Sequence, residues 1–371
     1  MTPSPRILGI ETSCDETAAA VVEAGRLVRA SIIASQHALH QRYQGVVPEI
    51  ASRAHLQKLS PVVIEALQTA NVTLDDIDAV AVGNRPGLIG SLLVGVSAAQ
   101  ALAWSTGKPL IGIDHVQAHL YAPNLSNQKP DAEGEAKRKT RNQEPIRYPA
   151  LGLVVSGGHT TLYHMRSATE MTRLGKTIDD AVGEAFDKAA VILNLGYPGG
   201  PAIDAAAQHG DPSAHELPIS LLDKRSLDFS FSGLKTALLY TVRGRPKGRG
   251  KHATFERSGE DLTDEQRRDL AASFQHTVVH TLIVKLERAL EHLRALSEPA
   301  RALVIGGGVS ANSLLRSRAD ELGARSGILV HLPDMAYCLD NAAMIAGLAH
   351  AYYESGQFSD LDLPAMATTA Y

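Results

Sequence analysis

The sequence predicts an α/β fold made of two related halves. Three apolar, strand-like runs end in turns of small residues, at Ile7–Ser13, Leu151–Thr160 and Ala302–Asn312. Glycines in such turns let backbone N–H groups approach an anion closely, because no Cβ stands in the way. The strand–turn–strand pattern of residues 7–22 recurs at residues 151–164, which indicates a duplicated unit. We therefore expect two domains with a nucleotide cleft between them.

The first half of the chain alternates strands with helices. Short apolar runs bounded by turn residues predict strands at residues 7–10, 18–22, 77–82 and 110–113. Apolar residues at helical spacing predict helices at residues 49–70, from about 91, and at 115–122. The apolar stretch Leu88–Trp104 is too short and too rich in small residues to span a bilayer, so we expect a buried helix and no membrane contact.

The second half repeats this alternation. Strands are predicted at residues 151–155, 160–164, 302–305 and 327–332, and helices at 179–194, 264–296 and 341–353. The longest helix presents Phe274, Val278, Leu282 and Leu286 along one side. Because hairpins occur within each half, we expect mixed rather than purely parallel sheets.

Length and composition divide the chain into domains. Its 371 residues exceed one ordinary core, which stops growing at about 250–300 residues. Two polar stretches contain almost no large apolar side chains, and we interpret the first as a flexible insertion and the second as a basic loop. The predicted domains are residues 1–125, the insertion 126–147, residues 148–340 with the basic loop 243–258, and a C-terminal helix and tail, 341–371, packing across the domain junction.

Charge and cysteine content narrow the function classes. A net charge of −4 gives no overall attraction to nucleic acid, so any such contact must come from a local patch or a partner. Two cysteines, Cys14 and Cys338, cannot build a disulfide framework and fit a reducing compartment. Residues Met1–Arg6 lack the basic and apolar regions of a secretory signal. We expect a cytoplasmic protein.

A pair of histidines marks a candidate metal site. His115 and His119 are four residues apart at the start of a predicted helix, a spacing that places both imidazoles on one face. Asp340, in a loop that leads into the last helix, is the best candidate for a third ligand. Two histidines and one carboxylate with open positions suit Fe(II) or Zn(II).

The spacing of His115 and His119 is equally compatible with an ordinary packing role. His276 and His280 have the same spacing inside the longest predicted helix, where we expect surface or packing roles. Zinc proteases place a glutamate directly after the first histidine of their motif, whereas this chain has Val116. No general base lies in the motif, so a metalloprotease is not favoured.

Several sequence blocks point to one family. They are Gly9–Thr17, Gly45–His55, Val155–Thr160, Ile178–Lys188, Tyr197–Pro201, Phe229–Lys235 and Gly306–Asn312. Together these blocks strongly resemble the TsaD family, once called the glycoprotease family, from about residue 7 to about residue 350. The resemblance implies the actin/Hsp70/sugar-kinase (ASKHA) type of fold. It also implies transfer of a threonylcarbamoyl group from threonylcarbamoyl-AMP to N6 of the adenosine just 3′ of the anticodon, in tRNAs that read codons beginning with A.

The resemblance further implies which residues bind. One divalent metal ion per subunit, with Fe(II) favoured over Zn(II), would be held by the residues that match His115, His119 and Asp340. Nucleotide contacts are implied at Val154, Val155, Ser156, Gly157, Gly158, Asp187, Gly200, Asp204 and Asn312. Backbone N–H groups of the glycine turn would receive the adenylate phosphate, the two aspartates the ribose hydroxyls, and Asn312 the base or ribose.

The implied reaction is metal-assisted acyl transfer. The mixed anhydride is already activated, so the enzyme must mainly orient it and stabilise oxyanion charge. No residue is obvious as general base. Glu11 is a candidate, and the alternative is that its side chain stabilises the turn in which it lies. A small-molecule kinase of the same fold, or a nucleotide-dependent binding module, would explain the nucleotide cleft but not the metal ligands.

The chain departs from the family pattern in two places. Relatives usually have a glycine before Pro-Gly-Leu, whereas this chain has Asn84-Arg85 before Pro86. Relatives usually have His-His-x-Glu-Gly-His, whereas this chain has Asp114 at the first position and Gln117-Ala118 before the last histidine. Both histidines needed for the metal are retained, and their surroundings are where this chain is expected to differ.

Partners follow from the resemblance and from local charge. Bacterial relatives work with a smaller paralogue, TsaB, and an ATPase, TsaE. The amphipathic segment Glu49–Ala70 is a candidate surface for the paralogue, with packing against its own sheet as the alternative. The basic stretch Arg243–Lys251 offers an electrostatic contact for tRNA phosphates, with a solvated loop as the alternative.

Overall fold

The computed structural model describes residues 4–41, 43, 45–127, 144–220, 223, 225–248 and 254–369. The chain divides into two compact units. Unit 1 comprises Met1–Ile146, Ser167–Glu170 and Leu332–Tyr371, and unit 2 comprises Arg147–Arg166 and Met171–His331. Unit 2 therefore ends before the boundary expected at residue 340, because the segment from Leu332 packs with unit 1. The expected packing of residues 341–371 across the domain junction stays a prediction.

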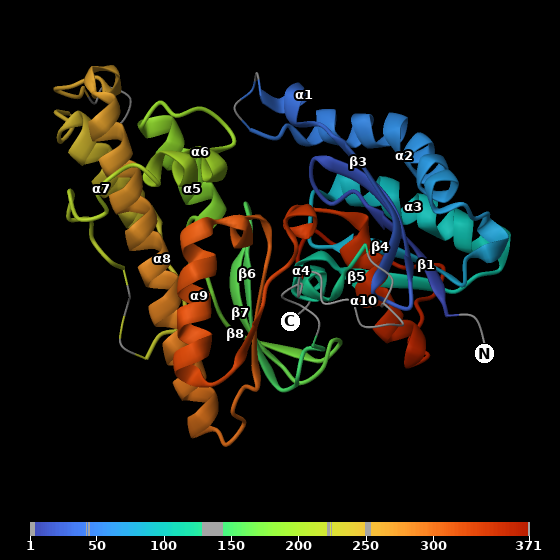
Figure 1. The fold of residues 1–371 in the computed structure, drawn as a ribbon. Coiled ribbons are helices and arrows are strands. Elements are labelled where there is room, and N and C mark those ends of the chain that lie inside the picture. Colours follow the sequence, from blue (N-terminus) through green and yellow to red (C-terminus); the bar gives the residue numbers. More distant parts are fainter. Residues whose placement is uncertain are drawn as a thin grey trace, which may run out of the picture. The chain divides into compact units, whose positions relative to one another are not determined.

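Unit 1 is built on a mixed sheet, five-stranded in the described part of the chain (Figure 1). Its strand order is β3-β2-β1-β4-β5, where β2 is antiparallel to its neighbours and β1, β4 and β5 run parallel. The strands are β1 (Arg6–Glu11), β2 (Glu16–Glu23), β3 (Leu27–Ser35), β4 (Ala79–Arg85) and β5 (Leu110–Asp114). The carboxyl ends of the three parallel strands consequently meet at one edge.

Helices cover both faces of this sheet (Figure 1). Alternate residues of β1 point to opposite faces: Leu8 and Ile10 pack toward α2 and α3, whereas Ile7 packs toward α4 and α10. Fully buried alanines of α10 fill that second face. The helices of unit 1 are α1 (His37–Gln41), α2 (Pro48–Ala70), α3 (Ile89–Thr106), α4 (His115–Tyr121) and α10 (Ala342–Glu354).

By length and composition alone, α3 would pass as a membrane span among the described helices. Its residues Val96, Ala99 and Ala103 belong instead to the buried core shared with α2. The other side of α3 is not covered, since Ile89, Leu93 and Trp104 are 49%, 51% and 76% exposed, so the helix is buried on one face only and not throughout as expected from the sequence.

Unit 2 repeats the sheet of unit 1. Its described strands follow the order β10-β9-β6-β7-β8, with β7 antiparallel to its neighbours and β6, β9 and β10 parallel. Read in reverse, β8, β7, β6, β9 and β10 take the places of β3, β2, β1, β4 and β5 in unit 1. This shared order confirms the duplication predicted from the sequence. The strands are β6 (Ala150–Val155), β7 (Thr160–Met165), β8 (Met171–Lys176), β9 (Ala302–Gly306) and β10 (Leu329–His331).

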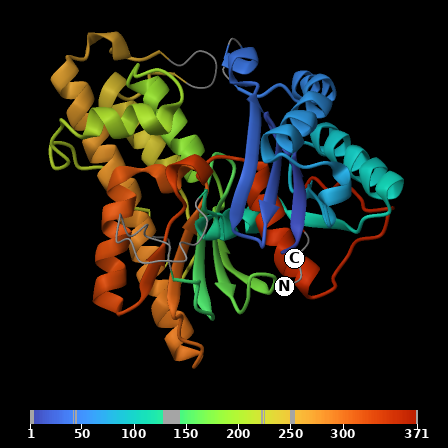
Figure 2. The ribbon, with the colours of Figure 1, turned by 45° about the vertical axis from the view of Figure 1, so that its right-hand side comes forward.

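The helices of unit 2 are dominated by α8, which lies beside α9 in both views (Figure 1, Figure 2). Thr263 and Gln266 form a capping box at the start of α8, and its buried stripe includes Phe274, Val278 and Leu282. The helices are α5 (Val182–Ile192), α6 (Gly199–Ala207), α7 (Ser232–Arg243), α8 (Asp264–Ala295) and α9 (Ser313–Ser326). Short 3₁₀ turns are η1 (Leu74–Asp76), η2 (Ala122–Asn124), η4 (Gly259–Asp261), η5 (Gly308–Ala311) and η6 (Met335–Tyr337).

Several boundaries differ from the sequence prediction. The strand expected at 327–332 is shorter, because Gly327 ends α9 in a left-handed conformation, with φ of 68°. The helix expected at 179–194 begins only at Val182, because Asp179 is engaged by the segment before α7. The central part of the insertion 126–147 and the tip of the basic loop lie outside the described residues.

Candidate metal centre and nucleotide site

The two candidate metal-binding histidines lie on α4, directly after β5. Asp114, the last residue of the strand, is the N-cap of this helix: its Oδ1 accepts hydrogen bonds from the backbone of Val116 at 3.0 Å and Gln117 at 3.2 Å. The helix therefore begins at His115, and His119 follows one turn later on the same side. The strand end and its cap set where both imidazoles stand.

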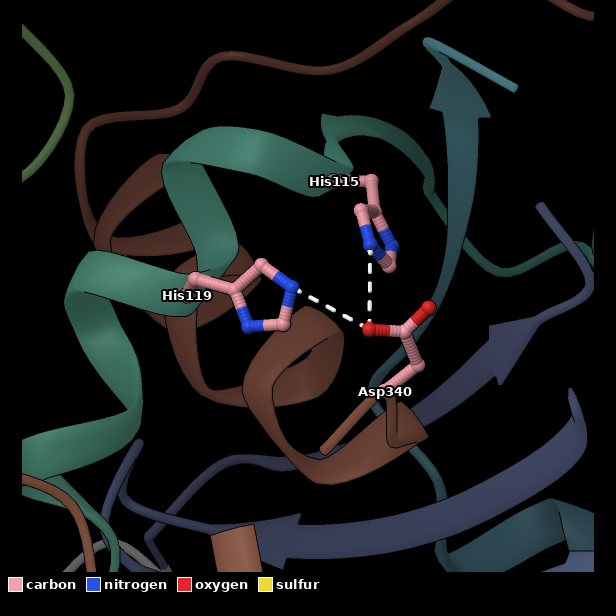
Figure 3. A group of neighbouring side chains, drawn as sticks. All are labelled: His115, His119 and Asp340. Atoms are coloured by element: carbon pink, nitrogen blue, oxygen red, sulfur yellow. Dashed lines mark ion pairs between the residues drawn. The ribbon is translucent and has the colours of Figure 1, made fainter. Parts of the chain in front are cut away.

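Asp340 joins the two histidines in unit 1 (Figure 3). Its Oδ1 lies 3.5 Å from Nε2 of His115 and 3.2 Å from Nε2 of His119. The two imidazole rings stand edge to face, with centroids 4.8 Å apart. Both histidines are buried, and Asp340 is partly exposed, so the group is reachable from one side.

A second carboxylate lies behind His115. Oε2 of Glu11, at the end of β1, is 2.9 Å from Nδ1 of His115, and the hydroxyl of Ser13 is 3.3 Å from the same nitrogen. Glu11 also accepts a hydrogen bond from the backbone of Ser13. With Nδ1 held by Glu11, Nε2 of His115 is the nitrogen directed at Asp340 (Figure 3). Gly83 leaves room for this carboxylate, since an added Cβ would lie 2.6 Å from Oε2 of Glu11.

These charges perturb each other's titration. Burial alone would lower the pKa of His115, but the carboxylates of Glu11 and Asp340 outweigh it and raise that pKa well above its usual value. Burial and the charge of His115 lower the pKa of His119. The pKa of Asp340 falls well below its usual range, because the two histidines overcome the opposing effect of burial. These opposite directions of the pKa favour the charged form of His115 and the neutral form of His119.

The donor set fits a divalent transition metal. Both ring nitrogens of His119 are buried without a hydrogen-bond partner among the described residues, and its Nε2 is aimed at Asp340. A buried polar atom of this kind costs free energy unless a ligand satisfies it. Two imidazoles and one carboxylate suit Fe(II) or Zn(II), and His115 has the carboxylate partner typical of metal-bound histidine.

Unit 2 carries the glycine turn predicted from the sequence. Val154 and Val155 end β6 in the core, whereas Gly157 and Gly158 are exposed and a Cβ on either would meet nothing within 4 Å. Ser156 anchors the turn: its carbonyl accepts a hydrogen bond from the backbone of Gly183, in the first turn of α5, at 3.2 Å. An open backbone therefore lies beside the N-terminus of a helix, an arrangement suited to an anion.

The glycine turn after β9, the third predicted from the sequence, packs against the second, after β6. Gly307, after β9, has φ of 96°, and an added Cβ would lie 2.5 Å from the carbonyl oxygen of Val155. β6 and β9 are parallel neighbours, with Val154 opposite Gly306, so both turns leave the same edge of the sheet. The structure thus brings together two of the three turns that the sequence singled out.

Each of the two predicted ribose-binding aspartates bonds to the start of another helix. Asp187 of α5 accepts a hydrogen bond from the backbone of Gly199 at the start of α6, at 2.8 Å. Asp204 of α6 accepts hydrogen bonds from the hydroxyl and backbone of Ser313, the first residue of α9, at 2.7 and 3.2 Å. Gly200, between them in sequence, has open space where a Cβ would be. Both carboxylates have a structural role beside any contact with a ligand.

Asn312 lies at the same helix start. Its Oδ1 accepts a hydrogen bond from the backbone of Leu315 at 3.0 Å, and its Nδ2 donates to Oε1 of Gln275 at 2.8 Å and lies 3.4 Å from Asp204. These bonds fix the start of α9 against α6 and α8 within unit 2. The predicted nucleotide residues therefore form a connected set, which runs from the glycine turn to the beginnings of α6 and α9.

Comparison with known proteins identifies the family. The family model of tRNA N6-adenosine threonylcarbamoyltransferase (TsaD) matches residues 27–347. The chain belongs to this family. The tRNA N6-adenosine threonylcarbamoyltransferase of Trichlorobacter lovleyi is 47% identical over 362 residues, which cover 98% of this chain and 96% of that protein. The enzyme of the same name from Symbiobacterium thermophilum is 47% identical over 360 residues, covering 97% and 95%. The resemblance stated from sequence blocks is confirmed.

Solved structures of more distant proteins bear out the fold. A full-length HypF, crystallised in a phosphate- and nucleotide-bound form, superposes with a TM-score of 0.55 at 14% identity. The match covers 97% of this chain and 48% of HypF. At this level of identity the likeness concerns the fold alone, and it agrees with the actin-like ASKHA fold expected for a TsaD protein.

Some residues that contact the candidate metal ligands or the predicted nucleotide residues were not foreseen from the sequence. Asp114 was noted only as a departure from the family pattern, although an aspartate just before a helix is a common N-cap signal. Ser13 and Gln275 had no recognisable signal, because their roles depend on long-range contacts with His115 and Asn312. Glu11 was considered as a base, and the structure places it against a candidate metal ligand instead.

Proposed function

We propose that this TsaD family member transfers the threonylcarbamoyl group to N6 of the tRNA adenosine by metal-assisted acyl transfer. Membership of the TsaD family is the observation that supports the overall reaction. The group of His115, His119 and Asp340 supports the metal-assisted route, because both ring nitrogens of His119 are buried without a hydrogen-bond partner among the described residues and a cation would satisfy one of them. Neither a small-molecule kinase nor a plain binding module accounts for this group.

The nucleotide part of threonylcarbamoyl-AMP is assigned to unit 2. Backbone N–H groups of Gly157 and Gly158 would donate to the phosphate, next to the N-terminus of α5. Asp187 and Asp204 keep lone pairs that can accept hydrogen bonds from ribose hydroxyls, and Asn312 would approach the base or ribose. The remaining contacts are assigned to Val154, Val155, Ser156 and Gly200.

The metal is assigned to unit 1. His115, His119 and Asp340 would hold one ion, with Fe(II) preferred over Zn(II). When bound, such an ion supplies a Lewis acid that polarises a substrate oxygen. Glu11, 2.9 Å from Nδ1 of His115, would orient the ring so that Nε2 faces the ion, and it is therefore a supporting residue rather than a general base.

The chemical step needs little covalent help from the protein. The exocyclic amine of adenosine attacks the carbamoyl carbon, a C–N bond forms, and the bond from that carbon to the phosphate oxygen breaks. AMP leaves with the bonding electrons, and the amine loses one proton. Because the anhydride is already activated, orientation and stabilisation of negative charge account for the acceleration.

We also assign partner surfaces on the two units. On α2, Leu56 and Ile64 are 68% and 55% exposed, which fits an apolar surface for a TsaB-like paralogue. Near the end of α7, Arg245 and Lys247 are exposed and fit tRNA phosphates. A TsaE-like ATPase completes the proposed set, and a cytoplasmic location follows from the tRNA substrate. A Leu56→Asp variant should lose the paralogue in size-exclusion chromatography and keep its metal.

The decisive experiment is mass spectrometry of nucleosides from an unmodified tRNA incubated with threonylcarbamoyl-AMP, this protein and the proposed partners. We expect the threonylcarbamoyl mass with the wild type and its loss in Asp340→Ala. Transfer that persists in Asp340→Ala would contradict the metal-assisted route and leave the family reaction intact. Absence of transfer beside an active relative would contradict the proposed activity itself. Metal analysis of protein purified without oxygen distinguishes iron from zinc.

A further inference from the structure

The two places where this chain departs from the family pattern are in contact. Arg85 ends β4 and Asp114 ends β5, and the two residues are paired across these parallel strands. An irregularity in register between Gly83 and Arg85 lets β4 reach Asp114. Nε of Arg85 lies 3.5 Å from Oδ2 of Asp114. The departures therefore form one ion pair within unit 1.

Asp114 uses its two carboxylate oxygens for different tasks. Oδ1 caps α4 through the backbone of Val116 and Gln117, and Oδ2 faces Arg85. The Asp114 side chain is only 3% exposed, so its charge requires a compensating cation. Arg85, at 32% exposure, supplies that cation through its buried Nε, which forms an ion pair with Oδ2 and has no hydrogen-bond partner among the described residues. The guanidinium thus fixes the orientation of the carboxylate that starts the helix.

The position of Arg85 is itself fixed by the C-terminal tail. Nδ2 of its neighbour Asn84 donates to the carbonyl of Pro364 at 3.0 Å, and the backbone of Met366 donates to the carbonyl of Asn84 at 2.9 Å. Asn84 is buried, at 1% exposure. A continuous set of contacts therefore runs from the tail through Asn84 and Arg85 to Asp114.

These contacts lead from the tail to α4, the helix that carries both candidate histidine ligands. α4 spans only His115–Tyr121, so its first turn determines where His115 and His119 stand relative to Asp340. A short helix has few internal hydrogen bonds, and its cap contributes a large share of its order. Small errors in ligand placement weaken metal binding markedly.

We propose that Arg85 and Asp114 are positioning residues for the metal ligands: Asp114 starts α4 at His115, and Arg85 holds Asp114 in its capping orientation. The inference rests on the proposed metal site and deepens it. It assigns a role to residues at which this chain differs from the family pattern. Neither residue touches the substrate or the metal in this scheme.

The test is a titration of the full-length, metal-free protein with Co²⁺, followed by visible absorbance. We expect Asp114→Ala to raise the dissociation constant about tenfold, in line with other supporting residues of metal sites. Arg85→Gln and Asp114→Asn should each raise it about threefold, and the double variant should match the singles because the two residues act as one pair. Activity of these variants should recover at saturating metal.

Controls separate a positioning role from plain loss of stability. Arg325→Gln removes a more exposed ion pair, with Glu287 in unit 2, and should leave Co²⁺ binding unchanged. Should Asp114→Ala fail to fold, Asp114→Asn decides, because asparagine retains the capping oxygen. Folded Asp114 and Arg85 variants that bind Co²⁺ as the wild type does, even with a lower melting temperature, would overturn the proposal.

His119→Ala, titrated in parallel, distinguishes failure of the inference from failure of the proposed site. If His119→Ala loses Co²⁺ and the Asp114 and Arg85 variants bind normally, only the positioning role is wrong. If the wild type does not bind Co²⁺, or His119→Ala binds it equally well, the proposed metal site is wrong and the positioning role falls with it.

Discussion

Units 1 and 2 share one strand order but use the edge of the sheet differently. In unit 1, the parallel strands end in Glu11, Arg85 and Asp114, whose charged side chains point into contacts with one another or with His115. In unit 2, the corresponding strand β6 ends in a turn where Gly157 and Gly158 leave the backbone open, and Gly307 after β9 packs closely against Val155. The first edge offers side-chain ligands, and the second offers backbone N–H groups.

The difference shows how a duplicated fold supports two kinds of recognition. A metal needs side-chain donors, which must be buried and paired to stay in place. A phosphate is satisfied by backbone amides, which require only that side chains be absent. The same topology can support both kinds of site, because the carboxyl ends of parallel strands lie at one edge of the sheet whatever residues follow them.

The largest effect should come from removing a metal ligand. His119→Ala should abolish metal binding in unit 1 and slow transfer on the order of 10³-fold, since a Lewis acid contributes several kcal/mol. Metal analysis and nucleoside mass spectrometry measure both. The matched control is His276→Ala, which removes a histidine of the same spacing from α8 of unit 2. Loss of metal in His276→Ala would contradict the assignment of the metal site to unit 1 alone.

A side chain on the bare backbone of unit 2 should have the next largest effect. Gly157→Val adds atoms where nothing else lies within 4 Å, so the fold should persist while the phosphate is displaced. Losing one hydrogen bond to a charged group, about 1.5–3 kcal/mol, corresponds to about 10- to 100-fold weaker AMP binding. Isothermal titration with AMP measures it. Gly233→Val, at a similarly open position, should bind AMP normally, and Co²⁺ binding should be unchanged in both variants.

Unit 2 should also show its own pH dependence of stability. Lys285 on α8 is fully buried, donates to the carbonyl of Ser226 at 2.7 Å, and has its pKa lowered to about 8, mainly by burial. The unfolded chain holds this proton up to about pH 10.4, so stability should rise between these two values. Lys285→Met should flatten the rise in melting temperature across that range, and exposed Lys58→Met should not. An unchanged profile in Lys285→Met would contradict the assignment.

The smallest effect concerns the basic loop after α7. Removing the exposed charges in Arg245→Gln/Lys247→Gln should weaken tRNA binding only severalfold and reduce the salt dependence of binding by about one to two counterions. Filter binding at a series of salt concentrations measures this slope. Arg301→Gln, before β9, serves as the control for loss of positive charge. An unchanged slope in the double variant would identify the loop as a solvated insertion.

The sequence predicted the central strands well because they are buried on both faces. β1 and β6 read as continuous apolar runs, which few other structures produce. The outer strands β3 and β8 were missed, since exposed and polar residues interrupt their pattern. Edge strands lack a neighbour on one side, and their sequences carry a correspondingly weaker signal.

The candidate site could be predicted only in part. The spacing of histidines selected two pairs equally, and burial separates them: His119 is inaccessible, whereas His280 is exposed. Burial depends on which elements pack together, and spacing does not reveal it. The pair of Arg85 with Asp114 depends on strand register, another property that emerges only when distant segments meet.

The discontinuity of unit 1 bears on how the protein is made. The ribosome synthesises β1 to α4, then all of unit 2, and only afterwards Asp340 and α10. A growing chain that already carries both histidines thus lacks the third ligand and the helix that fills one face of the first sheet. The complete set of proposed metal ligands exists only once translation is nearly finished, so truncated products of this gene are expected to emerge without a metal ion.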